Sequence, residues 1–244
     1  MSELARSFER AADAYELGRP GYAEAAIDAV GLAANSIVLD LAAGTGKLTR
    51  QLVPRFARVI AVEPLDGMRA VLERVVPEAE VLSGTADAIP LDDAAVAAVF
   101  VGEAFHWFAN AATLDELARV LRPRGTLAIL FNQADGDFEP LLPEAFWAAY
   151  REAAIEKPPE QTVSSGLWKS PFPGPFEPFA EQSFPNPIEL DRAQILAQAA
   201  SWSMIAGLPE SERSALLARL GELLPEGVYR HPLRTELYRT RLRS

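Results

Sequence analysis

From Ser36 to Phe131 the sequence alternates short apolar runs with amphipathic stretches, and this rhythm restricts the fold more than any other feature. Helices are expected near Gly46–Val53, Asp66–Val75 and Thr113–Leu121. Strands that alternate with helices build βαβ units, whose parallel sheet is covered on both faces. The sequence therefore predicts an α/β fold with a doubly wound, mostly parallel sheet. The expected strands are Ile37–Leu39, Val59–Val62, Val81–Leu82, Val96–Val101 and Thr126–Phe131.

After Phe131 the regular alternation ends. We expect a helix over 141–154, two further helices over 192–206 and 210–224, and a closing strand over 233–242. The stretch 157–187 holds eight of the 19 prolines. Proline removes a backbone donor and restricts the residue before it, so this stretch is expected to be an irregular excursion.

Composition excludes several classes of function. The absence of cysteine removes thiol nucleophiles, disulfides and cysteine-based metal sites, and two separated histidines do not make a metal centre. The net charge of −11 argues against binding to nucleic acids or to anionic membranes. Neither a signal peptide nor an apolar run long enough to span a membrane is recognised, so a cytoplasmic protein is expected.

A glycine-containing loop after the first strand carries most of the functional information. The strand ends near Asp40, and the loop that follows contains Gly44 and Gly46. Glycines at such a turn allow positive φ and let a ligand approach the backbone closely. Glu63, at the tip of the second strand, is expected to face the same crevice. A carboxylate there suits a ribose diol, and Asp40 can accept bonds from loop N–H groups or a ligand ammonium.

Two common nucleotide-binding loops do not fit this segment. A phosphate-binding P-loop requires Ser or Thr after Gly-Lys, but Leu48 follows Lys47. A dinucleotide fingerprint requires a third glycine three residues after Gly46, where the sequence has Thr49. The missing glycine disfavours a nicotinamide-dependent oxidoreductase, which stays an alternative.

Five motifs in order resemble the class I S-adenosylmethionine-dependent methyltransferases over roughly 8–131. The combination is specific, whereas the glycine loop alone is a weak signal. The AFHWF element and the N-terminal pattern from Phe8 to Tyr22 are similar to the small-molecule branch that includes trans-aconitate methyltransferase-like proteins. The motifs are VLDLAAGTG (38–46), VIAVEP (59–64), GTADAIPL (84–91), GEAFHWF (102–108) and ARVLRPRGTL (118–127).

The resemblance implies a Rossmann-like methyltransferase fold with a seven-stranded sheet and S-adenosylmethionine as cofactor. It implies that Glu63 holds the ribose, that Arg19 reaches toward the methionyl carboxylate, and that Gly102 offers backbone to the amino group. The first glycine of the family's loop is Ala42 here, which is tolerated if its φ is negative, and a common aspartate is Thr85. The implied cofactor-binding residues are Tyr15, Arg19, Asp40, Ala42, Gly44, Gly46, Glu63, Pro64, Met68, Thr85, Ala86, Asp87 and Gly102.

Three further residues are candidates on the substrate side. His106 is the histidine expected in the crevice, and its near-neutral pKa suits a general base, although methyl transfer does not require one. Trp107 and Trp168 are expected to form walls of the substrate pocket. His231, beside Pro232, is expected to face solvent.

The resulting hypothesis is an enzyme that moves a methyl group from S-adenosylmethionine to a small-molecule acceptor without a metal. Its expected organisation is a helical lid segment over 1–34, a cofactor-binding core over 35–135, and C-terminal helices and closing strands over 136–244, all in one domain. The Pro-rich stretch is hypothesised to help close the site. A non-catalytic S-adenosylmethionine-binding module stays an alternative. Oxygen, nitrogen and carbon acceptors all stay open, as does the oligomeric state.

Overall fold

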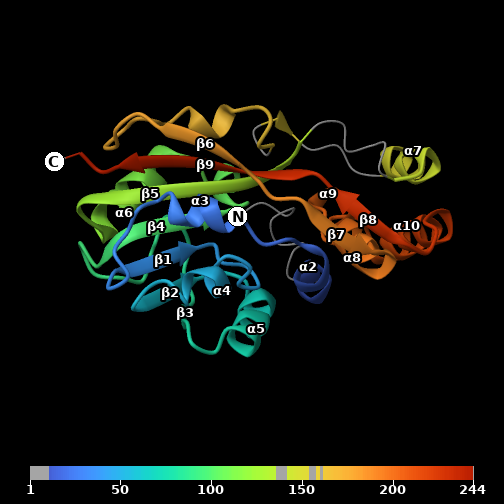
Figure 1. The fold of residues 1–244 in the computed structure, drawn as a ribbon, viewed down its shortest axis with the longest axis horizontal. Coiled ribbons are helices and arrows are strands. Elements are labelled where there is room, and N and C mark those ends of the chain that lie inside the picture. Colours follow the sequence, from blue (N-terminus) through green and yellow to red (C-terminus); the bar gives the residue numbers. More distant parts are fainter. Residues whose placement is uncertain (1–10, 136–141, 154–157, 160–161, 244) are drawn as a thin grey trace.

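A computed structural model describes residues 11–135, 142–153, 158–159 and 162–243, and its centre is one seven-stranded sheet (Figure 1). Strands β1 to β5 pair in parallel, whereas β9 is antiparallel to both β5 and β6. The predicted doubly wound, mostly parallel fold is therefore confirmed. In sheet order the strands are β3 (Glu80–Leu82), β2 (Arg58–Val62), β1 (Ile37–Leu41), β4 (Val96–Gly102), β5 (Leu121–Ala134), β9 (Leu233–Arg241) and β6 (Ala180–Pro185).

The buried strands read as continuous apolar runs because both faces of the sheet are covered. On β1, Val38 packs into one core cluster and its neighbour Leu39 into another, and both side chains are fully buried. Helix α6 (Ala111–Val120) contributes Leu117 to the cluster on the Leu39 face. Helix α3 (Glu24–Asp28) contributes Ile27 to the cluster on the opposite face. Period-two alternation is therefore absent from these strands.

Strand order reverses direction at β1, which has β2 on one side and β4 on the other. In a parallel sheet this switch point leaves a crevice beyond the carboxyl ends of the strands. The loops after β1, β2 and β4 all open at that edge. Helices α4 (Thr49–Leu52) and α5 (Asp66–Val75) follow β1 and β2. The helix after the glycine loop is shorter than predicted, since it begins at Thr49 rather than at Gly46.

The C-terminal helices form a second layer with its own core beyond the crevice (Figure 1). N-terminal helix α2 (Ala12–Gly18) lies against α8, and a Cβ on Gly18 would stand 2.1 Å from the Gln198 amide nitrogen. This close approach fixes α2 between the two layers. The elements of the layer are α7 (Glu144–Ala153), β7 (Ile188–Asp191), α8 (Arg192–Ala200), α9 (Ser203–Ala206), α10 (Glu210–Leu223) and β8 (Val228–His231).

Two expectations about the C-terminal half are wrong. The Pro-rich stretch is not a purely irregular excursion, because it includes edge strand β6 and contributes the buried side chains of Trp168 and Phe176 to the main core. An edge strand tolerates proline, and Pro185 is its last residue. The stretch is therefore part of the packed fold, which argues against a detachable lid. The expected helix over 192–206 is broken by the extended backbone at Trp202.

His231 is buried rather than solvent-facing. It pairs with Ile188 in the two-stranded β7–β8 sheet, and its side chain has no exposed surface. Burial disfavours the charged imidazolium, so it lowers the pKa of His231 to about 4. The neighbouring Pro232 is typical of a loose tail, but the pairing of β8 with β7 holds His231 in the interior. None of the helices in the described ranges is long and apolar enough to cross a membrane.

Candidate functional site

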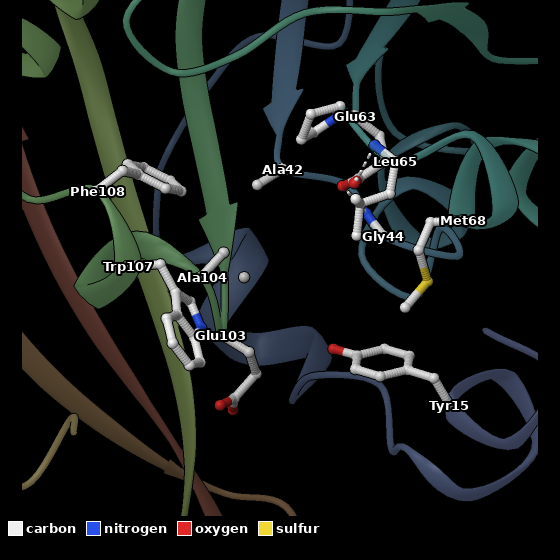
Figure 2. A pocket seen from close by; sticks show the side chains of 12 residues that line it. Tyr15, Ala42, Gly44, Glu63, Leu65, Met68, Glu103, Ala104, Trp107 and Phe108 are labelled. Carbon is white, nitrogen blue, oxygen red and sulfur yellow. Dashed lines mark hydrogen bonds between the residues drawn. The ribbon is translucent and has the colours of Figure 1, made fainter. Parts of the chain in front are cut away.

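The crevice at the sheet's switch point contains a cavity of about 120 Å³ (Figure 2). Its walls come from the ends of β1, β2 and β4, from α5 and from α2, which supplies Tyr15. Figure 2 shows the hydroxyl of Tyr15 pointing across the cavity toward Glu103 and Trp107. The lining residues are Tyr15, Ala42, Gly44, Glu63, Pro64, Leu65, Met68, Gly102, Glu103, Ala104, Trp107 and Phe108.

Glu63 is held rigidly at the tip of β2. Its Oε2 accepts a hydrogen bond from the Gly44 amide at 2.9 Å, and its Oε1 accepts one from the Leu65 amide at 3.0 Å. The side chain is 4% exposed, and burial raises the pKa of Glu63 against the lowering effect of these two bonds. A carboxylate offers about four lone-pair sites, so two are left to accept hydroxyl protons from a ligand in the cavity.

Asp40 lies one strand away from Glu63 and is buried even more completely. Its Oδ2 accepts a hydrogen bond from the Thr49 hydroxyl at 2.6 Å, which ties the end of β1 to the start of α4. Its Oδ1 is buried and has no hydrogen-bond partner among the described residues. Burial raises the pKa of Asp40 to about 7. Such an oxygen is costly to leave unpaired and is suited to a donor on a bound ligand.

Three residues of the loop between Asp40 and Thr49 have a left-handed backbone conformation. Ala42, Gly44 and Gly46 have φ of 57°, 59° and 88°. The condition under which alanine was expected to fit, a negative φ, is therefore not met at Ala42, because the loop keeps a conformation that glycine adopts readily. For an L-residue this conformation costs about 1–2 kcal/mol.

The two glycines of this loop serve different ends. A Cβ on Gly46 would meet Leu72 Cδ1 at 2.4 Å, and the absence of a side chain at Gly46 therefore permits close packing against α5. A Cβ on Gly44 would meet nothing within 4 Å, because Gly44 faces the open cavity. Only Gly44 therefore offers bare backbone to a ligand.

The end of β4 presents Gly102 and Glu103 to the same cavity. A Cβ on Gly102 would stand 2.3 Å from the Tyr22 hydroxyl, so only glycine fits beneath that ring. Glu103 adopts a left-handed φ of 57°, and its Oε1 accepts a hydrogen bond from the Asn132 amide. Strained backbone of this kind clusters at functional sites. The sequence prediction missed Glu103, although an acidic residue just beyond a strand tip is the signal that identified Glu63.

A neighbouring cavity of about 380 Å³ lies beyond Pro64 and Trp107. Thr85, Ala86 and Asp87 line it together with Phe108 and residues at the start of α6. The Thr85 hydroxyl donates to Asp87 Oδ1 at 2.5 Å, which lowers the pKa of that carboxyl group. The predicted adenine-side residues therefore do lie together next to Glu63's cavity, with Trp107 and Phe108 shared by both spaces.

Three predicted residues lie elsewhere than expected. His106 is 8% exposed and packs its ring against Trp107 and Phe131; it is not among the side chains lining the two cavities. Trp168 is wrong as a substrate-pocket wall, because it is buried in the main core against Phe131 and Tyr238. The backbone of the proline-rich stretch places Trp168 in the core, where its ring packs against other buried side chains.

Arg19 is the third of these residues. Its Nε donates to the Ser201 hydroxyl at 2.8 Å and its Nη2 to the Ser201 carbonyl at 3.2 Å. It lines two further cavities beyond Tyr15 rather than the one that contains Glu63. Its guanidinium lies 5.3 Å from the centroid of the Tyr15 ring.

Comparison with known proteins identifies the family. Residues 39–129 match a methyltransferase domain. A methyltransferase-like protein of Schizosaccharomyces pombe is 33% identical over 217 residues, which are 86% of this chain and 82% of that protein. The chain belongs to the methyltransferase family. An uncharacterized methyltransferase of Mycobacterium tuberculosis is 49% identical over 133 residues, so the match spans about half (55%) of that relative's length.

Solved structures of other proteins share the fold of this chain. A SAM-dependent methyltransferase from Aquifex aeolicus superimposes with a TM-score of 0.54 at 17% identity, covering 94% of this chain and 97% of that one. The matched domain of the methyltransferase contains Asp40, Gly44, Glu63 and Gly102, which line or flank the cavity. Tyr15 and Arg19, on and just after α2, lie outside the matched residues.

Proposed function

We propose that the protein transfers a methyl group from S-adenosylmethionine to a small-molecule acceptor by in-line displacement. The observation that carries the proposal is the pair of buried carboxylates at the switch point of the sheet, of which Glu63 lines the cavity and accepts a hydrogen bond from the Gly44 amide. Glu63 keeps lone pairs for a ribose diol, and the unpaired Oδ1 of Asp40 suits a ligand N–H donor. These features fit the cofactor of the family.

The remaining cofactor contacts follow from the positions of the cavities. Pro64 and Met68 line the cavity beside Glu63, where an adenine ring can pack against them. Thr85 and Asp87 line the adjoining cavity, where they can meet the adenine edge. Gly102, at the end of β4, lines the same cavity, where its backbone can meet the methionyl amino group. Trp107 lines both cavities and is the proposed wall beside the transferred methyl group.

The contribution of the protein to the reaction is chiefly alignment and exclusion of water. When bound, the cofactor supplies an electrophilic methyl group on a sulfonium whose departure leaves a neutral thioether. The acceptor must then be held in line with that methyl group at about 3–3.5 Å. Tyr15 from α2 covers the cavity, and burial raises the pKa of Tyr15 to about 12, so its hydroxyl stays protonated and can donate.

No proton transfer is assigned to His106, because its ring packs between Trp107 and Phe131. The small-molecule class of acceptor is supported by the small volume of the cavities and by the net charge of −11, which disfavours nucleic acid. The similarity of the N-terminal pattern to trans-aconitate methyltransferase-like proteins supports the same class.

The test combines a binding measurement with a turnover measurement. Calorimetric titration with S-adenosylhomocysteine is expected to show saturable binding, whereas NAD is expected to show none; the reverse result would establish the oxidoreductase alternative. A screen of small acids, amines and phenols with S-adenosylmethionine, read out as homocysteine after enzymatic cleavage of the product, is expected to find turnover. Tight binding with no turnover across the screen would instead establish a non-catalytic binding module.

A further inference from the structure

The cavity that contains Glu63 does not end at Tyr15. Tyr15 and Glu103 also line a polar space of about 70 Å³. Arg19 lines that space and also a third cavity, of about 230 Å³, on the side of the C-terminal helices. Each space therefore shares lining residues with the next: Tyr15 and Glu103 line both the first cavity and the polar space, and Arg19 lines both the polar space and the third cavity.

The third cavity, here called the aromatic recess, has preformed apolar walls. It is lined by Arg19, Trp147, Tyr150, Trp202, Ser203 and Met204. The rings of Trp147 and Trp202 are stacked with centroids 5.8 Å apart and an interplanar angle of 11°. Tyr150 stands edge-on to both rings, and its hydroxyl donates to Met204 Sδ at 3.3 Å. An apolar cavity of about 150 Å³ holds a benzene molecule, so this recess can hold a ring with a short chain.

The charge at the recess selects against cations. An aromatic box alone would suit a quaternary ammonium group. Arg19, however, brings a permanent positive charge to the recess, and no Asp or Glu is among the residues that line it. Two of its five N–H groups are occupied by Ser201, which fixes the plane of the guanidinium. The remaining donors suit a carboxylate.

We propose that the aromatic recess binds the methyl acceptor, and that this acceptor is a carboxylic acid with an apolar, ring-sized body. Its carboxylate is bound by Arg19, and its body packs against Trp147 and Trp202. This inference rests on the proposed methyl transfer. It assigns Arg19 to the acceptor rather than to the cofactor, because Arg19 lines the recess and the polar space but not the cavity that contains Glu63.

The test uses three probes with one apolar body: 4-phenylbutyrate, 4-phenylbutanamide and 4-phenylbutylamine. Each is titrated calorimetrically into protein saturated with S-adenosylhomocysteine. The acid is expected to bind about tenfold or more tightly than the amide, since it gains charge-assisted bonds, and the amine is expected to bind weakest. Trp202→Ala is expected to weaken the acid and the amide together, because it removes a wall that both share.

Variants of Arg19 separate its two possible roles. Arg19→Met is expected to abolish the preference for the acid over the amide while leaving the affinity for S-adenosylhomocysteine unchanged. Arg19→Lys keeps the charge and is expected to keep part of the preference. Arg230→Met is the matched control, because this exposed arginine pairs with Glu189 on β7 and lines none of the cavities described above, so it is expected to change neither affinity.

Two results would overturn the inference. Equal binding of acid and amide by the parent protein would show that the recess does not select an anion. A loss of S-adenosylhomocysteine affinity in Arg19→Met, with the acid preference intact, would return Arg19 to the cofactor. The titration with S-adenosylhomocysteine alone is read separately: its failure would refute the proposed function, whereas binding without acid preference would refute only this inference.

Discussion

Replacing Gly44 with alanine is expected to weaken cofactor binding strongly while leaving the fold intact. Gly44 has φ of 59°, and a Cβ there would meet no protein atom within 4 Å. The cost to the free energy of unfolding is therefore the left-handed conformation alone, about 1–2 kcal/mol. The amide of Gly44 keeps its bond to Glu63, so the carboxylate stays in place. The added methyl group projects only into the space that the ligand must occupy.

Gly166→Ala is a matched control for this substitution. Gly166 has φ of 69°, and a Cβ there would also meet nothing within 4 Å. Both variants are expected to lose the same 1–2 kcal/mol in urea unfolding. Only Gly44→Ala is expected to weaken S-adenosylhomocysteine in calorimetry, by about 100-fold or more, which corresponds to about 2.7 kcal/mol. Equal affinities for the two variants would refute the idea that the ligand approaches the bare backbone of Gly44.

Three further predictions concern α2, Asp40 and Ala42. Gly18→Ala is expected to lower the free energy of unfolding by about 2–3 kcal/mol, because the added methyl group clashes with α8. Gly227→Ala is the control: a Cβ there meets nothing within 4 Å, so no change is expected in the same urea titration. Similar losses of stability in the two variants would contradict the packing of α2. Because burial raises the pKa of Asp40 from 3.8 to about 7, its stabilising contribution is complete below pH 4 and is lost as the pH rises through 7. The parent is therefore expected to lose stability relative to Asp40→Asn between about pH 4 and pH 7, and parallel pH profiles would count against this. Ala42→Gly is expected to raise the free energy of unfolding by about 0.5–1 kcal/mol, and a decrease would show that φ at this position is not strained.

The sequence alone located the two carboxylates because their positions depend only on strand order. Asp40 and Glu63 stand at the carboxyl ends of adjacent parallel strands, and such ends meet at one edge of any doubly wound sheet. The apolar runs identified β1, β2 and β4 for the same reason, since a strand covered on both faces has no polar side. In these cases the sequence pattern determines the position of the residue directly, without knowledge of the tertiary packing.

The residues that sequence reasoning misplaced depend on tertiary packing. His231 and Trp168 both lie in or beside proline-rich sequence, and only strand pairing and core packing reveal that they are buried. The positive φ of Ala42 and Glu103 leaves no trace in composition. The separation of Arg19 from the cofactor cavity depends on where α2 packs against α8, which no local pattern encodes.

The central claim is that Glu63 binds the ribose of S-adenosylmethionine. The most direct test is calorimetric titration of S-adenosylhomocysteine into the parent protein and into Glu63→Gln, which keeps the size of the side chain and one acceptor oxygen. Charged hydrogen bonds contribute about 1.5–3 kcal/mol each, so Glu63→Gln is expected to lose at least about tenfold in affinity while it stays folded. Equal affinity for the two proteins, or no binding by the parent, would contradict it.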